Sequence, residues 1–164
     1  CGNTHNIFPL AEPHLYDKAY IFCCPMSGGK TTHINLWREL YDCEVISDNI
    51  SFIKIDENSE DIRLITYVSP WIEIEDQCYE KRIPLSGIAF IKQGKENMIF
   101  DLEMQDFGYN LFENNNVFFI TKDMVDKCVQ NVNVIAKLGK GYNLTCNKEK
   151  DAAIKAYEKM VLKK

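Results

Sequence analysis

The feature that most constrains the fold is a short segment of glycine, lysine and threonine, Gly-Gly-Lys-Thr-Thr at residues 28–32. The apolar and aromatic residues 20–24 before it predict a buried strand. After it, apolar residues recur at spacings of three and four, which predicts a helix over residues 30–41. A strand, a glycine turn and a helix in this order indicate an α/β domain.

This segment has the form of the second half of a phosphate-binding loop, G-x-x-x-x-G-K-[S/T]. Small residues let the backbone N–H groups turn inward around phosphates, and the positive end of the following helix faces the same anion. Lys30 would reach the β and γ phosphates of ATP, and the Thr31 hydroxyl would bind Mg²⁺. The alternative is a chance turn that opens an ordinary helix. The predicted cofactor-binding residues are Ser27, Gly28, Gly29, Lys30, Thr31 and Thr32.

A phosphate loop also needs an acidic group that holds or orients the metal. Asp48 directly follows the predicted strand at residues 44–46. A βαβ unit brings the ends of successive strands together, so Asp48 would reach the Mg²⁺ or the attacking hydroxyl. We therefore predict Asp48 and Lys30 as catalytic, and Thr31 and Asp48 as metal ligands. The alternative is that Asp48 caps a turn together with Asn49.

The rest of the chain reads as one domain, residues 1–164, without internal repeats or linkers. Residues 1–14 are expected to be loosely ordered, and the absence of an initiator Met suggests a fragment of a longer chain. Thr121 is the predicted cap of one helix. The further predicted strands are 50–55, 62–68, 85–92, 98–100 and 142–146, and the further predicted helices are 103–112, 121–138 and 148–162.

The amino-acid composition excludes several classes of partner and cofactor for this chain. Nineteen basic against 24 acidic residues give a net charge of −5, which argues against a whole-surface basic field and a nucleic-acid partner. No apolar run approaches the roughly 20 residues of a membrane span. Seven scattered cysteines without a CxxC pair indicate a reducing compartment, and we predict the cytoplasm. Three histidines and these cysteines support no zinc site. Self-association into a homo-oligomer is left open.

Several motifs in order resemble the nucleotide-binding core of the HPr kinase/phosphorylase and phosphoenolpyruvate carboxykinase group, and most nearly a bacterial branch of uncharacterised HPr-kinase-like proteins. The likeness runs from about residue 20 to the C-terminal helix. The motifs are Ser27-Gly28-Gly29-Lys30-Thr31-Thr32-His33, Leu36-Trp37, Ile46-Ser47-Asp48-Asn49, Ser69-Pro70-Trp71, residues 84–91 and Tyr142-Asn143-Leu144.

The resemblance implies a mixed β-sheet with flanking helices and a P-loop for MgATP. It also implies transfer of the γ-phosphoryl group to a serine-like hydroxyl on a protein, a peptide or a small molecule. Three departures stand out: Cys24 occupies the first glycine position of the loop, Met26-Ser27 replaces the usual Ser-Gly, and Asn49 replaces the second acid. An amide can bind Mg²⁺ but cannot accept a substrate proton. The alternative is therefore a degenerate, catalytically weak nucleotide-binding or scaffold domain.

Three aromatic side chains complete the candidates. His33, on the first helical turn, either contacts phosphate or the acceptor or is exposed. Trp71 either contacts the substrate or plugs a hydrophobic gap. Trp37 fits the buried stripe of its helix and is expected to pack in the core.

Overall fold

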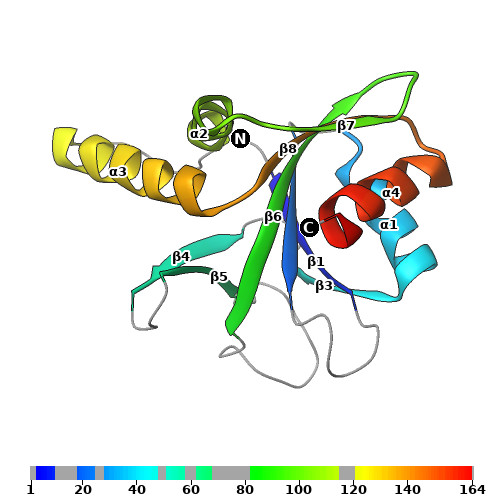
Figure 1. The fold of residues 1–164 in the computed structure, drawn as a ribbon, viewed down its shortest axis with the longest axis horizontal. Coiled ribbons are helices and arrows are strands. Elements are labelled where there is room, and N and C mark those ends of the chain that lie inside the picture. The colour runs from blue at the N-terminus through cyan, green and yellow to red at the C-terminus, as the bar shows by residue number, and fades with distance from the viewer. Residues whose placement is uncertain are drawn as a thin grey trace.

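The computed structural model describes residues 3–9, 18–24, 28–47, 51–57, 62–67, 82–114 and 121–163. Within these residues, eight strands form one mixed sheet with helices on both faces (Figure 1). The strands are β1 (Asn3–Pro9), β2 (Ala19–Cys24), β3 (Cys43–Ser47), β4 (Phe52–Asp56), β5 (Arg63–Tyr67), β6 (Arg82–Gln93), β7 (Met98–Asp101) and β8 (Gly141–Cys146). The helices are α1 (Lys30–Tyr41), α2 (Met104–Glu113), α3 (Lys122–Leu138), α4 (Lys150–Tyr157) and the π-helix η1 (Glu158–Leu162).

The long strand β6 organises the sheet. The strand order is β3-β1-β2-β6-β5-β4, and β8 pairs with both β6 and β7. β6 is parallel to β2 and β8, and its first residues pair antiparallel with β5. Every residue of β2 is buried. Parallel strands covered on both faces have such continuous apolar runs, which explains why residues 20–24 read as a buried strand.

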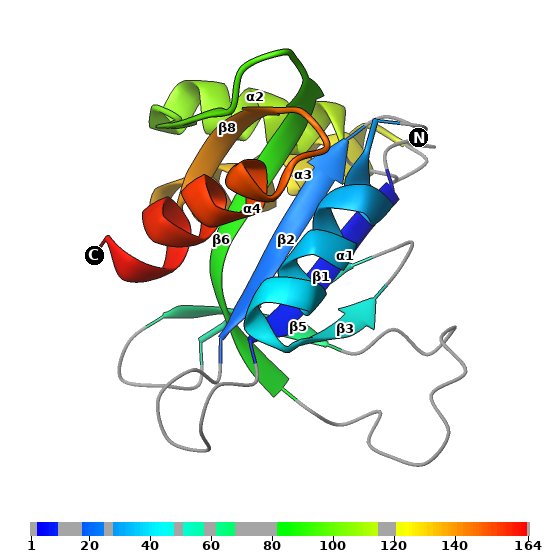
Figure 2. The ribbon, with the colours of Figure 1, turned by 90° about the vertical axis from the view of Figure 1, so that its right-hand side faces the viewer.

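Alternate residues of the central strands belong to two separate hydrophobic cores, because successive side chains of a strand point to opposite faces of the sheet. Tyr20, Phe22 and Cys24 belong to the core under α1 and α4. Ile21 and Cys23 belong to the core that includes residues of α2 and α3. Figure 2 shows α1 and α4 side by side over one face of the sheet, with α2 and α3 behind it.

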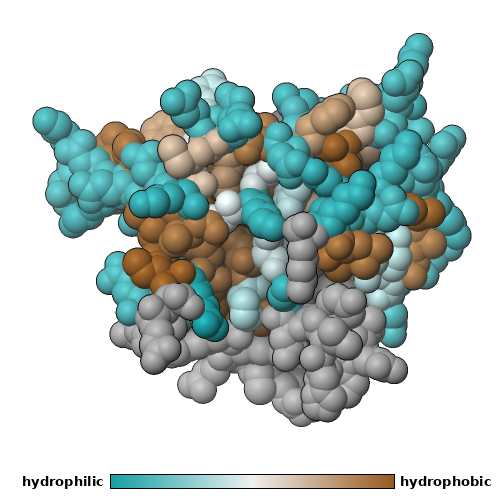
Figure 3. Space-filling view, viewed as in Figure 1, coloured by the Kyte–Doolittle hydropathy of each residue, from teal (hydrophilic) through white to brown (hydrophobic). Residues whose placement is uncertain are grey.

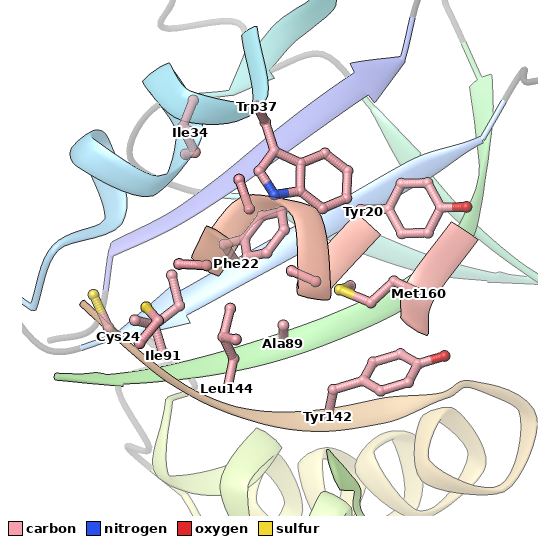
Figure 4. Close-up of a cluster of buried hydrophobic side chains, with 14 of the residues drawn as sticks. Tyr20, Phe22, Cys24, Ile34, Trp37, Ala89, Ile91, Tyr142, Leu144 and Met160 are labelled. Carbon is pink, nitrogen blue, oxygen red and sulfur yellow. The ribbon is translucent and has the colours of Figure 1, made fainter. Parts of the chain in front are cut away.

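Trp37 of α1 lies in the middle of the first core and is fully buried. Its ring meets Phe22 edge-on at 5.2 Å and Tyr157 of α4 edge-on at 5.6 Å between ring centroids. Figure 4 shows Trp37 from the helix side and Phe22 from the sheet side pointing toward one another. The prediction that Trp37 packs in the core is confirmed.

The predicted elements are largely confirmed, and α1 has the predicted bounds. Thr121 caps α3: its hydroxyl accepts a hydrogen bond from the backbone N–H of Met124 at 3.3 Å. Two features differ from the prediction. Residues 3–9 form β1, which corrects the expectation of loose order for this part of residues 1–14, and the C-terminal helix ends as the π-helix η1.

The five cysteines in the described part of the chain are all free and buried. Burial raises the thiol pKa of Cys23 and Cys43 to about 12 and that of Cys146 to about 11. These thiols therefore stay protonated at neutral pH and act as small hydrophobic side chains.

On the face shown in Figure 3, hydrophobic side chains gather between α3 and the β4–β5 hairpin. Phe52 of β4 is 42% exposed, and Val129 of α3 is 41% exposed. None of the helices in the described ranges combines the length and the apolar content that crossing a bilayer requires.

Gly141 and Gly108 differ in the space available for a side chain, so alanine substitutions at the two positions are expected to have opposite effects on stability. A Cβ on Gly141 would lie 2.4 Å from the ring of Phe107, a core residue with little room to move, whereas a Cβ on Gly108 of α2 would meet only ordinary contacts at 3.7 Å or more. We expect Gly141→Ala to lower the free energy of unfolding by about 1–3 kcal/mol. Gly108→Ala, in the interior of a helix, is expected to raise it by about 0.5–1 kcal/mol. Urea unfolding measures both; a Gly141→Ala variant as stable as the wild type would contradict this packing.

Candidate functional site

The candidate site lies where β2 ends and α1 begins. Gly28 and Gly29 lead directly into α1, whereas Ser27 lies outside the described residues. Gly29 is the N-cap of α1, with a φ of 95° and a ψ of 8°. Side chains are disfavoured in this left-handed region, so the turn into the helix depends on glycine here.

Lys30 is the first residue of α1, and its side chain is folded back into the protein. It is only 6% exposed, and its ammonium donates a hydrogen bond to the backbone carbonyl of Cys24 at 3.0 Å. This bond links the last residue of β2 to the first residue of α1 across the glycine turn. The same ammonium lowers the pKa of the Cys23 thiol, against the larger effect of burial.

No carboxylate in the described part of the chain pairs with Lys30. An ammonium has three N–H donors, and a buried charge without a counter-ion is costly. A carbonyl dipole compensates it only in part. The arrangement therefore leaves positive charge and donor capacity for an anion at the glycine turn.

The start of α1 adds to this positive potential. No side chain caps the helix, and its first turn contains no acidic residue. The first intrahelical bond runs from the N–H of His33 to the carbonyl of Gly29 at 3.0 Å, so the N–H groups of residues 30–32 have no helical acceptor. Thr31 is exposed and Thr32 is half-buried beside them. Free N–H groups and the helix dipole favour an anion at such an end.

Cys24 at the first position of the loop is accommodated without strain. It is the last residue of β2, its φ is not positive, and its side chain is 2% exposed within the first core. Glycine is needed only where the backbone takes a conformation that a Cβ opposes. The departure at Cys24 therefore leaves the turn at Gly29 intact.

Gln93 is a neighbour of the loop that the sequence did not reveal. Its side-chain amide nitrogen lies 3.9 Å from the position that a Cβ would take on Gly29. Gln93 ends β6, the strand parallel to β2, one residue beyond the predicted strand 85–92. The signal that could have found it is the gathering of polar residues where neighbouring parallel strands end.

Asp48 and Asn49 lie outside the described residues, but β3 ends at Ser47 directly before them. β3 is antiparallel to β1 and β1 is antiparallel to β2, so β2 and β3 point toward the same edge of the sheet. β1 lies between them, which places the two strands about 10 Å apart. The pairing of β3 with β1 is irregular just before the end of β3, where the register shifts between Asn6 and Ile7. Within the described ranges, no three His, Cys, Asp or Glu side chains gather into a metal site.

His33 is 2% exposed, so the alternative that it is an exposed residue is wrong. Its Nε2 accepts a hydrogen bond from the indole N–H of Trp37 at 3.0 Å, and its ring packs against Phe22 at 5.0 Å. Its Nδ1 has no partner among the described residues. Burial lowers the pKa of His33 from 6.5 to about 4. The imidazole is therefore neutral at physiological pH, and Nδ1 carries its proton.

This depressed pKa predicts a pH-dependent stability. Between pH 4 and 6.5 the unfolded chain binds a proton at His33 that the folded protein does not, so the free energy of unfolding rises with pH across this window. One proton contributes at most about 1.4 kcal/mol per pH unit. His33→Gln keeps an acceptor for Trp37 and is expected to have a shallower slope. Urea unfolding of both proteins at pH 4.5 to 7 measures the difference, and identical slopes would contradict it.

The structure thus brings Gly28, Gly29, Lys30, Thr31 and Thr32 together with Gln93, whereas Ser69-Pro70-Trp71 lies outside the described residues. Comparison of the chain with models of known protein families, with curated proteins and with solved structures found no match.

Proposed function

We propose that this chain is a MgATP-binding, kinase-like domain that transfers the γ-phosphoryl group to a hydroxyl on a protein, a peptide or a small molecule. The observation that carries the proposal is the buried ammonium of Lys30, held at a glycine turn by one carbonyl and without a carboxylate partner in the described residues. The uncapped start of α1 supports it, because both features favour an anion at the same place.

Each residue of the candidate site has its own role in the proposed phosphoryl transfer. The ammonium of Lys30 exchanges the carbonyl of Cys24 for a phosphate oxygen and offsets developing negative charge, and the N–H groups of the first turn orient the phosphates. Thr31 offers its exposed hydroxyl to the metal, and Asp48 takes the acceptor's proton. ATP supplies the phosphoryl group, so the protein mainly positions the reactants and stabilises charge.

A second candidate is a catalytically weak nucleotide-binding or scaffold domain. Asn49 favours it, because an amide cannot share the role of base with Asp48. Asn49→Asp separates the two functions: a gain in ATP turnover over the wild type would favour the degenerate domain, and clear turnover by the wild type that the variant does not exceed would favour the kinase. A cytoplasmic location belongs to the same proposal and is supported by the free cysteines of the described ranges.

Thr31 provides a test that leaves the core intact, because its side chain is exposed. Calorimetric titration with MgATP is expected to show about tenfold weaker binding for Thr31→Ala than for the wild type, or roughly 1.4 kcal/mol. The loss should vanish when Mg²⁺ is left out, because the hydroxyl acts through the metal. Asn35→Ala, an exposed change on the same helix, is the matched control and should bind like the wild type. Equal affinities for Thr31→Ala and the wild type would contradict the assignment of Thr31 as a metal ligand.

A further inference from the structure

A cavity of about 450 Å³ lies at the amino end of β8, away from the glycine loop. Gly141 lines it, whereas Cys146, at the other end of β8, pairs with Gln93 beside the loop. A strand rises about 3.3 Å per residue, which separates the cavity from the loop end of β8 by roughly 17 Å. The cavity is therefore a second concave region, distinct from the candidate phosphate loop.

Part of the lining of this cavity is apolar. Phe107 and Ala136 of the second core line it, together with Leu102 and Met104. Met104, at the start of α2, is 57% exposed, so its side chain is accessible from the solvent. Figure 1 shows η1 on one side of β8 and α2 with the end of α3 on the other. Sites for small organic molecules combine such apolar walls with a few polar groups.

The rim of the cavity is cationic. Lys140, Lys159 and Lys163 line it against one carboxylate, Asp101, which pairs with Lys159. Lys140 and Lys163 are exposed, and neither forms an ion pair with another described residue. The charged lining residues therefore carry a net two positive charges, in a chain whose overall charge is −5.

A backbone feature of η1 supports a binding role. The start of α2 adds no net positive potential at the cavity, because its N-cap is Glu103 and its first turn contains Asp106. Lys159 and Lys163 extend from the wide π turn of η1, in which the N–H of Lys163 bonds to the carbonyl of Glu158 at 3.0 Å. π-helical turns are rare and frequently lie at functional sites.

We propose that this cavity binds a phosphate monoester with an apolar or aromatic body. A phosphate monoester carries close to two negative charges at neutral pH, which matches the net charge of the lining residues, whereas a carboxylate would neutralise only half of it. The ammonium groups of Lys140 and Lys163 bind the phosphate, and the side chains of Leu102 and Met104 contact the body. The site is independent of the function proposed for the glycine loop.

The test is a calorimetric titration with 1-naphthyl phosphate, accompanied by amide NMR. Submillimolar, saturable binding is expected, with the largest shifts at residues 139–142. Inorganic phosphate, which has no apolar body, and 1-naphthoate, which has a single charge, should each bind at least tenfold more weakly. The double variant Lys140→Gln/Lys163→Gln should lose at least tenfold in affinity. The control Lys122→Gln/Lys127→Gln removes the same charge from exposed positions on α3 and should bind like the wild type.

Four results would overturn the proposal. They are the absence of saturable binding by the wild type, equal affinities of the two double variants, binding of inorganic phosphate as tight as that of the naphthyl ester, and shifts confined to residues 28–32. The last result would show that the ester binds at the glycine loop. Binding of MgATP at the loop is not involved in any of these outcomes, so the two sites can fail separately.

Discussion

Lys30→Met is expected to weaken MgATP binding at least 100-fold. Methionine keeps most of the length of the side chain but removes the buried positive charge of Lys30 at the glycine turn. A 100-fold loss corresponds to about 2.7 kcal/mol, the size expected for a charged hydrogen bond to phosphate. Calorimetric titration with MgATP measures it.

The control for this change is Lys127→Met. Lys127 is an exposed lysine of α3 that pairs with Asp123 at 3.0 Å on the surface, so its loss should leave nucleotide affinity unchanged. Lys30→Met also leaves the carbonyl of Cys24 without its donor, so the folded fraction of each variant has to be measured by circular dichroism. A folded Lys30→Met protein that binds MgATP as tightly as the wild type would refute the role of Lys30.

Trp37→Ala is expected to lower the free energy of unfolding by about 3–5 kcal/mol, which is enough to unfold a marginally stable domain. Trp37 is fully buried and joins α1 to both β2 and α4 through its contacts with Phe22 and Tyr157. Its removal leaves a large cavity, and the Nε2 of His33 loses the hydrogen bond that it accepts from the indole N–H. Urea unfolding followed by circular dichroism measures the change.

Trp37→Phe and Tyr109→Ala serve as controls. Trp37→Phe keeps an aromatic ring but loses the bond to His33, so its cost should fall clearly below that of Trp37→Ala. Tyr109 is 62% exposed on α2, and its truncation should cost less than about 0.5 kcal/mol. A Trp37→Ala protein within 1 kcal/mol of the wild type would contradict the packing of α1 on the sheet.

The elements that the sequence predicted share one property: their apolar pattern matches their environment. β2 is buried on both faces and is a continuous apolar run in the sequence. α1 has an apolar stripe, and the helix ends at its C-cap Asp42. β1 has no such pattern. It is mostly polar and depends on pairing with β2 on one edge and β3 on the other, which are long-range contacts that local periodicity does not report. The insertion of β1 between β2 and β3 was missed for the same reason.

The candidate site was predictable in part. The turn at Gly29 and the helix start at Lys30 follow from the local sequence, because glycine punctuates turns and a strand-loop-helix has a fixed order. The bond between Lys30 and the carbonyl of Cys24 depends on how the loop folds back, and the position of Gln93 depends on which strands are neighbours. The burial of His33 could have been predicted, because His33 lies four residues before Trp37 and therefore on the same, buried face of the helix.

The backbone amide signals of residues 28–32 in a titration with MgATP test most directly whether the glycine turn holds a triphosphate. Saturable shifts that are largest at Gly28, Gly29 and Lys30, and that Lys30→Met abolishes, are the predicted result. Amide signals at this turn that stay unchanged at millimolar MgATP, while the protein is folded, would contradict the proposed function.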